Sequence, residues 1–116
     1  MTVLRKDASA ISNFFDRIEA GLGKRGSSFM DLDAISHDAD GDRFLVREFK
    51  EVHEVMSDAQ RRTLEALAKL PLVTVWVVRR TSVPDILAWL SLSSGETECL
   101  TIDQYRDYVR RWWMCR

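Results

Sequence analysis

Two charged residues, Glu48 and Lys50, end a segment that is otherwise typical of a buried strand. Residues 43–50 are rich in apolar, β-branched and aromatic side chains. Because side chains alternate along a strand, Glu48 and Lys50 share the face that begins with Phe44 and Val46. A charged group directed toward an apolar interior is costly unless it is paired or binds a metal ion. These two side chains are therefore the first candidates for a functional site.

Two aspartates, Asp31 and Asp33, share one face of the preceding predicted strand, 29–36. An Asp-Gly dipeptide at 40–41 separates the two strands and favours a hairpin, because it tolerates positive φ. Carboxylates on neighbouring strands, with a backbone carbonyl and water molecules, suit Mg²⁺ or Mn²⁺. A lysine beside them can orient the attacking water and balance phosphate charge. The pattern predicts metal-assisted hydrolysis of a phosphodiester bond.

The remaining elements are predicted from apolar periodicity and from capping signals. Helices are expected over 8–22, from Ser57 to about Leu70, and from Thr101 onward, and further strands over 72–78 and 86–92. Ser57 with Gln60, and Thr101 with Gln104, have the spacing of capping boxes.

The order of these elements predicts the fold class. The run 72–78 is almost continuously apolar, as in a buried strand, and a crossover would pair it parallel with 43–50. The order αββαβ, followed by a strand and a helix, predicts a single mixed-sheet α/β domain over residues 1–116.

Composition sets further bounds. Of the 116 residues, 46% are hydrophobic and 30% charged, and the net charge of -1 does not by itself indicate a nucleic-acid partner. Cys99 and Cys115 are too few for a disulfide framework and match no zinc motif. Neither a signal-peptide core nor an apolar run of membrane-spanning length is found. A cytoplasmic protein without membrane contacts is expected.

An aspartate closing an apolar run, a hairpin, and an apolar-Glu-x-Lys strand together resemble the PD-(D/E)XK superfamily of restriction-endonuclease-like nucleases. The matching residues are Asp31 and Glu48-Phe49-Lys50, and the similarity extends over about residues 8–80. The resemblance implies that Asp31 and Glu48 bind Mg²⁺ or Mn²⁺, that the Phe49 carbonyl assists, and that Lys50 serves the attacking water.

Other positions fit the resemblance less closely. Several branches carry a glutamine on the next helix, which Gln60 would match as a fourth catalytic candidate, and some use an acid of the first helix, for which Glu19 is the best candidate. Met30 stands where the family has proline. Asp31 is preferred because it closes the run before it, and Asp33 stays a possible second ligand.

The expected substrate is DNA, with basic residues as candidate phosphate contacts. These are Lys24, Arg25, Arg79 and Arg80. A domain this small favours structure-selective cleavage of branched or single-stranded DNA. By resemblance, the leading subtype is a Holliday-junction resolvase. This subtype implies a homodimer that acts in DNA repair or recombination.

Three other interpretations stay open. Glu48 and Lys50 could be an ordinary exposed pair that contributes little to stability. The nuclease-like fold could serve as a catalytically inactive DNA-binding or protein-interaction subunit. RNA could be the substrate in place of DNA.

Overall fold

The computed structural model of the chain describes residues 2–4 and 32–115. Within these ranges, six strands form one mixed sheet in the order of the chain, and two helices flank it. The elements are β1 (Thr2–Leu4), β2 (Ala34–Asp38), β3 (Arg43–Lys50), α2 (Asp58–Ala68), β4 (Val73–Arg80), β5 (Ile86–Ser91), β6 (Thr97–Thr101) and α3 (Ile102–Met114). The predicted mixed-sheet α/β architecture is confirmed.

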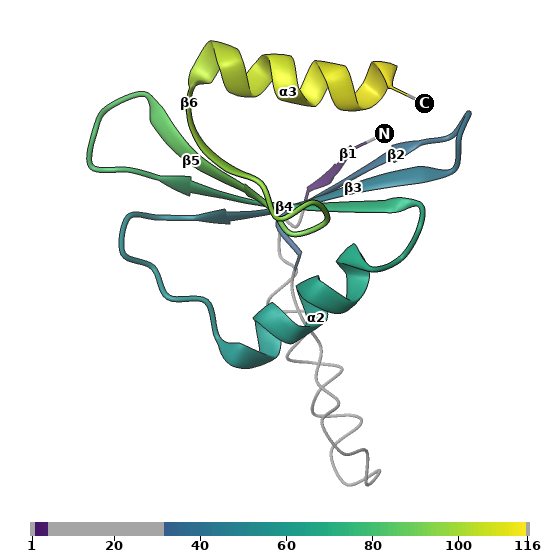
Figure 1. Cartoon of the computed structure of the whole chain (residues 1–116), viewed down its shortest axis with the longest axis horizontal. Coiled ribbons are helices and arrows are strands. Elements are labelled where there is room, and N and C mark those ends of the chain that lie inside the picture. Colours follow the sequence, from purple (N-terminus) through teal and green to yellow (C-terminus); the bar gives the residue numbers. More distant parts are fainter. Residues whose placement is uncertain (1, 5–31, 116) are drawn as a thin grey trace, which may run out of the picture.

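The two helices cover opposite faces of the sheet (Figure 1). On one face, Leu64 of α2 packs against Val46, Val75 and Val77, and the expected contacts of Leu67 and Ala68 are present. On the other face, α3 packs on a larger, aromatic-rich cluster. That cluster contains Leu45, Trp76, Val78, Trp89, Leu100 and Trp112. The sheet is therefore buried on both sides along its central strands.

Strands β3 and β4 form the parallel pair, as the near-continuous apolar run of β4 predicts. Glu48 lies opposite Val77, and Lys50 lies opposite Arg79. Since parallel strands end at the same edge, the charged ends of β3 and β4 lie side by side. Helix α2 connects the two strands, and Ser57 caps its start by accepting the N–H of Gln60 at 3.1 Å. The helix begins near the charged edge, since Gln60 in its first turn accepts a hydrogen bond from Lys50.

The predicted hairpin between β2 and β3 is confirmed, since the two strands pair antiparallel, but its turn is shorter than the gap between the predicted strands 29–36 and 43–50. Strand β2 continues to Asp38, which pairs with Arg43, so four residues form the turn. Asp42, with φ of 49°, takes the left-handed conformation instead of Gly41. The Asp38 carboxylate explains the longer strand, because it accepts the N–H of Asp40 at 3.2 Å and the guanidinium of Arg43 at 2.8 Å.

Other boundaries also need correction. Asp33 lies just before β2 and not within a strand, β4 extends through Arg79 and Arg80, and β6 was not predicted. Strand β6 is an exposed edge with only Leu100 buried, so it lacks the alternating pattern that indicates a strand. The predicted helix 8–22 and the first residues of the predicted strand 29–36 lie outside the described ranges.

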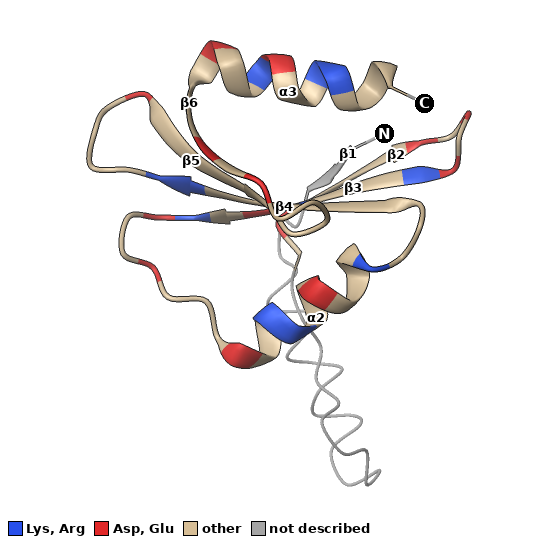
Figure 2. Ribbon diagram, in the orientation of Figure 1, with Lys and Arg blue, Asp and Glu red and all other residues tan. Residues whose placement is uncertain are grey.

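Charges of both signs are interspersed on the helices (Figure 2). On α3, Arg106 and Arg110 each pair with an acid one turn earlier, Asp103 and Asp107. These pairs fit a solvated helix face. Neither described helix is long and apolar enough to cross a membrane.

We expect Leu64→Ala to lower the free energy of unfolding by about 2–5 kcal/mol, because Leu64 is fully buried between α2 and the sheet. Leu70→Ala, at a position 50% exposed, is the matched control and should cost about 0.5 kcal/mol. Urea unfolding of the three proteins measures both values. Equal losses for the two variants would contradict the packing described for α2.

Candidate acid–lysine site

Glu48 and Lys50 lie at the end of β3 on the face covered by α2. Their relative exposures are 4% and 6%, so both are buried although both carry ionisable groups. They are not in tight contact, because Lys50 Nζ lies 3.9 Å from Glu48 Oε1. The hypothesis of an ordinary exposed pair is therefore wrong, and each group needs another partner to offset its loss of water.

Gln60 supplies that partner to both groups. Its Nε2 donates to Glu48 Oε1 at 2.8 Å, and its Oε1 accepts from Lys50 Nζ at 2.8 Å. The Gln60 side chain therefore bonds to residues of β3. Half of the capping box expected at Ser57 is confirmed, because the serine side chain accepts the Gln60 N–H. The other half is wrong, because the Gln60 side chain does not bond back to the Ser57 backbone. At Thr101 and Gln104 both halves of the box form.

Asp33 joins the cluster from the segment before β2. Its Oδ2 accepts the backbone N–H of Phe49 at 2.7 Å, which fixes the carboxylate beside the end of β3. Burial, followed by the negative charge of Asp33 and a hydrogen bond with it, raises the pKa of Glu48 to about 7, although the charge of Lys50 opposes this shift. Asp33 and Glu48 therefore form a close pair of carboxyl groups.

One oxygen of this pair lacks a donor. Glu48 Oε2 is buried and receives no hydrogen bond from the described part of the chain, whereas Oε1 is held by Gln60. Two ionised carboxylates cannot donate to each other. Either a proton or a cation at this position would stabilise the buried oxygen.

Glu54 is a member of the cluster that the sequence did not indicate. Its carboxylate lies 3.3 Å from Lys50 Nζ, and hydrogen bonds from the Glu51 N–H and from Lys50 lower its pKa. The strand ends at Lys50, so periodicity carries no information about which later residue returns to it. No sequence signal would have found Glu54.

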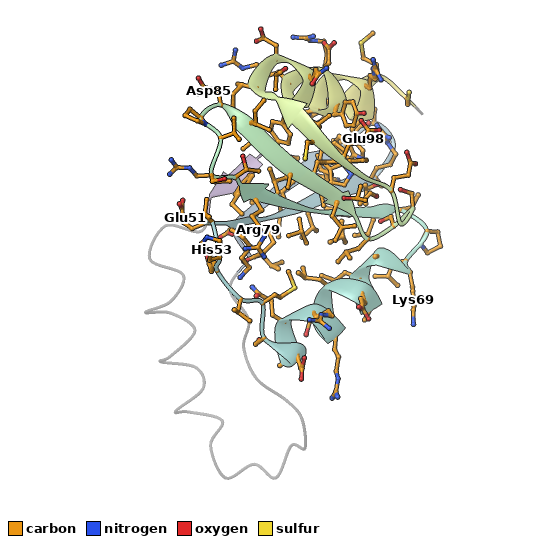
Figure 3. The ribbon with its side chains drawn as sticks, turned by 60° about the vertical axis from the view of Figure 1, so that its left-hand side comes forward. Glu51, His53, Lys69, Arg79, Asp85 and Glu98 are labelled. Carbon is orange, nitrogen blue, oxygen red and sulfur yellow. The ribbon has the colours of Figure 1, made fainter. Side chains whose placement is uncertain are left out.

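The two candidate phosphate contacts on β4 have different surroundings. Figure 3 shows Arg79 beside Glu51 and His53 at one end of the sheet. Arg79 Nη1 donates to the carbonyl oxygens of Glu51 at 2.9 Å and Glu54 at 2.5 Å, so it ties the loop after β3 to β4. Arg80 is exposed and lies 3.3 Å from the Glu51 carboxylate.

The donor set fits a hard divalent cation held by few protein ligands. The described residues contain no group of three acidic, His or Cys side chains arranged to hold a metal ion. Mg²⁺ commonly uses only one or two carboxylates together with water and substrate phosphate. Asp33 and Glu48 meet that requirement, and the unpaired Glu48 Oε2 is the atom that such an ion would stabilise.

The structure thus brings Asp33, Glu48, Lys50 and Gln60 together. Four other predicted residues lie outside the described ranges: Glu19, Lys24, Arg25 and Asp31. No family model, curated protein or solved structure matches the chain in the comparisons with known proteins.

We expect the metal-free protein to lose stability as pH rises from about 4.5 to about 7. In this range the native state holds a proton on Glu48 that the unfolded chain, with its ordinary pKa of 4.5, has released. The loss attributable to Glu48 is up to about 3 kcal/mol. Urea unfolding in EDTA, at pH 5 and pH 8, measures it.

Two variants isolate the contribution of Glu48. Glu48→Gln mimics the protonated acid and should flatten this part of the pH profile, whereas Glu65→Gln, at an exposed position on α2, should leave it unchanged. A Glu48→Gln profile as steep as that of the wild type would show that another group causes the loss.

Proposed function

We propose that the protein is a metal-dependent nuclease that hydrolyses phosphodiester bonds in DNA, with Asp33, Glu48 and Lys50 as its reactive groups. The observation that carries the proposal is that Glu48 and Lys50 are both buried and both hydrogen-bonded to one side chain, the amide of Gln60.

A purely structural ion pair is a weaker explanation of this arrangement. Buried pairs offset their loss of hydration through close, well-aligned contact. Here the closest partner of Lys50 is the Gln60 amide, and Glu48 keeps one buried oxygen without a donor. Asp33 adds a second negative charge beside that oxygen. Such a geometry favours cation binding over maximal stability of the apoprotein.

The residues of the chain have distinct parts in the proposed reaction. A bound Mg²⁺ or Mn²⁺ would supply a Lewis acid for the phosphate and lower the pKa of a bound water. Asp33 and Glu48 would hold it, and the Phe49 carbonyl remains a proposed further ligand. Gln60 is a positioning residue, since its Nε2 orients the Glu48 carboxylate.

Lys50 would act on the water and the phosphate. Its ammonium is fixed by Gln60 Oε1 and by Glu54, which leaves its position defined before substrate arrives. An ammonium donates hydrogen bonds and cannot accept a proton while charged. It would therefore orient the attacking water and stabilise the negative charge that develops on the phosphate oxygens.

The finer fold proposal is a restriction-endonuclease-like domain. The β2–β3 hairpin, the crossover helix α2 and the parallel strand β4 agree with the ββαβ part of that core. A DNA substrate with branched or single-stranded character, a homodimer like the Holliday-junction resolvases, and a role in DNA repair or recombination belong to the same proposal.

We expect purified protein with Mg²⁺ or Mn²⁺ to nick branched or single-stranded DNA, and EDTA to stop the reaction. Lys50→Ala should lower the cleavage rate at least about 100-fold, since it removes both charge stabilisation and orientation of the water. Lys69→Ala, an exposed lysine at the C-terminal end of α2, is the matched control and should cleave like the wild type.

Calorimetric titration with Mn²⁺ accompanies the cleavage assay. Glu48→Gln should abolish a heat of binding that Lys50→Ala retains. Unchanged cleavage by Lys50→Ala would overturn the enzymatic assignment. Binding of DNA without any Mn²⁺ heat would instead favour the inactive DNA-binding or interaction subunit.

A further inference from the structure

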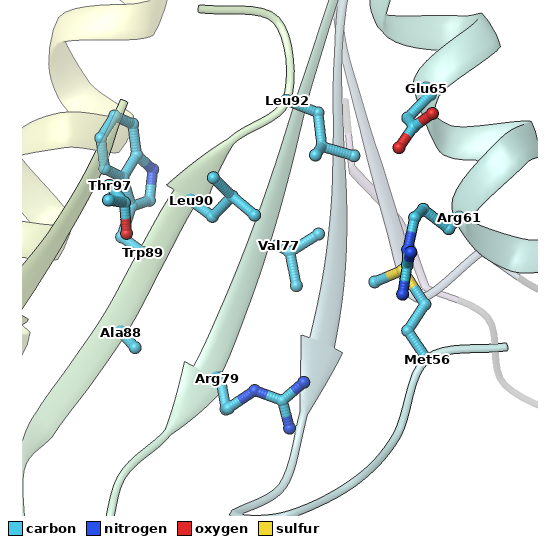
Figure 4. A pocket seen from close by; sticks show the side chains of 10 residues that line it. All are labelled: Met56, Arg61, Glu65, Val77, Arg79, Ala88, Trp89, Leu90, Leu92 and Thr97. Atoms are coloured by element: carbon cyan, nitrogen blue, oxygen red, sulfur yellow. The ribbon is translucent and has the colours of Figure 1, made fainter. Parts of the chain in front are cut away.

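A pocket of about 370 Å³ opens between α2 and the neighbouring half of the sheet (Figure 4). Its walls come from the loop before α2, from α2 itself, from β4, β5 and β6, and from the residue that follows β5. The lining residues are Met56, Arg61, Glu65, Val77, Arg79, Ala88, Trp89, Leu90, Leu92 and Thr97. None of them belongs to the acid–lysine cluster, which consists of Asp33, Glu48, Lys50, Glu54 and Gln60.

The pocket is nevertheless the immediate neighbour of that cluster. Val77 and Arg79 on β4 are the register partners of Glu48 and Lys50 on β3, so one strand spacing of about 4.8 Å separates the two rows. On α2, Arg61 directly follows Gln60. A group bound in the pocket would therefore lie next to a phosphate bound at the cluster.

The floor of the pocket is aliphatic. Val77 and Leu90 face each other across β4 and β5, with Ala88 opposite Arg79 in the same ladder. Figure 4 shows the side chains of Val77, Leu90 and Leu92 directed from the sheet toward α2. Such a surface suits the flat apolar face of a nucleobase.

The rim of the pocket is positively charged. Arg61 from α2 and Arg79 from β4 line it against a single acid, Glu65. Arg61 is exposed and makes no ion pair with any of the described residues. Arg79 is held in place by two backbone carbonyls through Nη1 alone. Two guanidiniums around an aliphatic floor complement an anion that carries a planar apolar group.

We propose that this pocket binds one unpaired nucleotide adjacent to the scissile phosphate, and that the protein therefore selects single-stranded or frayed nucleic acid over intact duplex. This inference rests on the proposed nuclease function. The volume lies at the small end of the range for ligand pockets, about 300–1,000 Å³, which suits one nucleotide. A base stacked and paired in a duplex cannot enter such a pocket until it leaves the helix.

The test measures binding without cleavage. Fluorescence anisotropy in EDTA compares the full chain with a short fluorescein-labelled oligothymidylate and with a blunt DNA hairpin. Arg61→Ala should weaken oligothymidylate binding about tenfold, the loss expected for one charged hydrogen bond, and lower the salt slope by about 0.7. Arg62→Ala, the adjacent exposed arginine outside the pocket lining, should stay within about twofold of the wild type.

A second variant fills the pocket and keeps its charge. Ala88→Phe places a ring over the aliphatic floor and should remove the preference for oligothymidylate over the hairpin, with cooperative unfolding as the check that it folds. Equal affinity of wild type for both probes would overturn the inference. So would Arg61→Ala and Ala88→Phe variants that bind like Arg62→Ala.

The two proposals fail separately. Pocket-dependent binding without Lys50-dependent cleavage would overturn the nuclease and leave a nucleotide-binding pocket. Lys50-dependent cleavage with equal rates on oligothymidylate and hairpin, unaffected by Ala88→Phe, would overturn the pocket and leave the nuclease.

Discussion

The amide of Gln60 is the contact on which the charged end of the sheet depends. Glu48 and Lys50 are both removed from water and stand 3.9 Å apart, so neither is the other's close partner. Without Gln60, Lys50 would keep only the more distant carboxylate of Glu54, at 3.3 Å, and Glu48 would lose the donor to Oε1. Because Gln60 donates to one and accepts from the other, it fixes both side chains without neutralising either. A direct ion pair would have occupied the carboxylate and the ammonium with each other. The glutamine instead bridges the two groups without a close contact between them.

The position of that amide follows from how α2 is anchored. Ser57 starts the helix and sets Gln60 in its first turn, and Leu64, one turn later, is fully buried against the sheet. The hydrophobic contact and the polar bridge therefore lie on one face of one helix. Movement of α2 along the sheet would separate Gln60 from β3 at the same time as it exposed Leu64. Packing on this face thus serves the geometry of the site as well as stability.

The sequence was most informative where a local pattern determines the structure. Strand β3 could be predicted to the residue, and with it the shared face of Glu48 and Lys50, because alternation along a strand is a local property. The residues that complete the cluster come from irregular backbone, Asp33 before β2 and Glu54 after β3, where no period applies. The role of Gln60 as a bridge was also hidden, since its spacing from Ser57 equally suits a capping box. Strand β6 was not predicted, because its first three residues are all exposed and polar or small and so show no apolar alternation.

Net charge limits how such a site could hold a nucleic acid. A chain with a net charge of -1 gains little from long-range attraction to phosphate, and three acids, Asp33, Glu48 and Glu54, gather around Lys50. In the proposed nuclease, attraction to the phosphates would have to be local, from a bound cation and from the arginines beside the cluster. Arg79 lies one strand away on β4 and Arg61 lies on α2, and both line the pocket that is proposed to hold an unpaired nucleotide. Because a small pocket with two arginines would hold one nucleotide better than the wide backbone of a duplex, the low net charge and the proposed pocket would favour the same unpaired substrate.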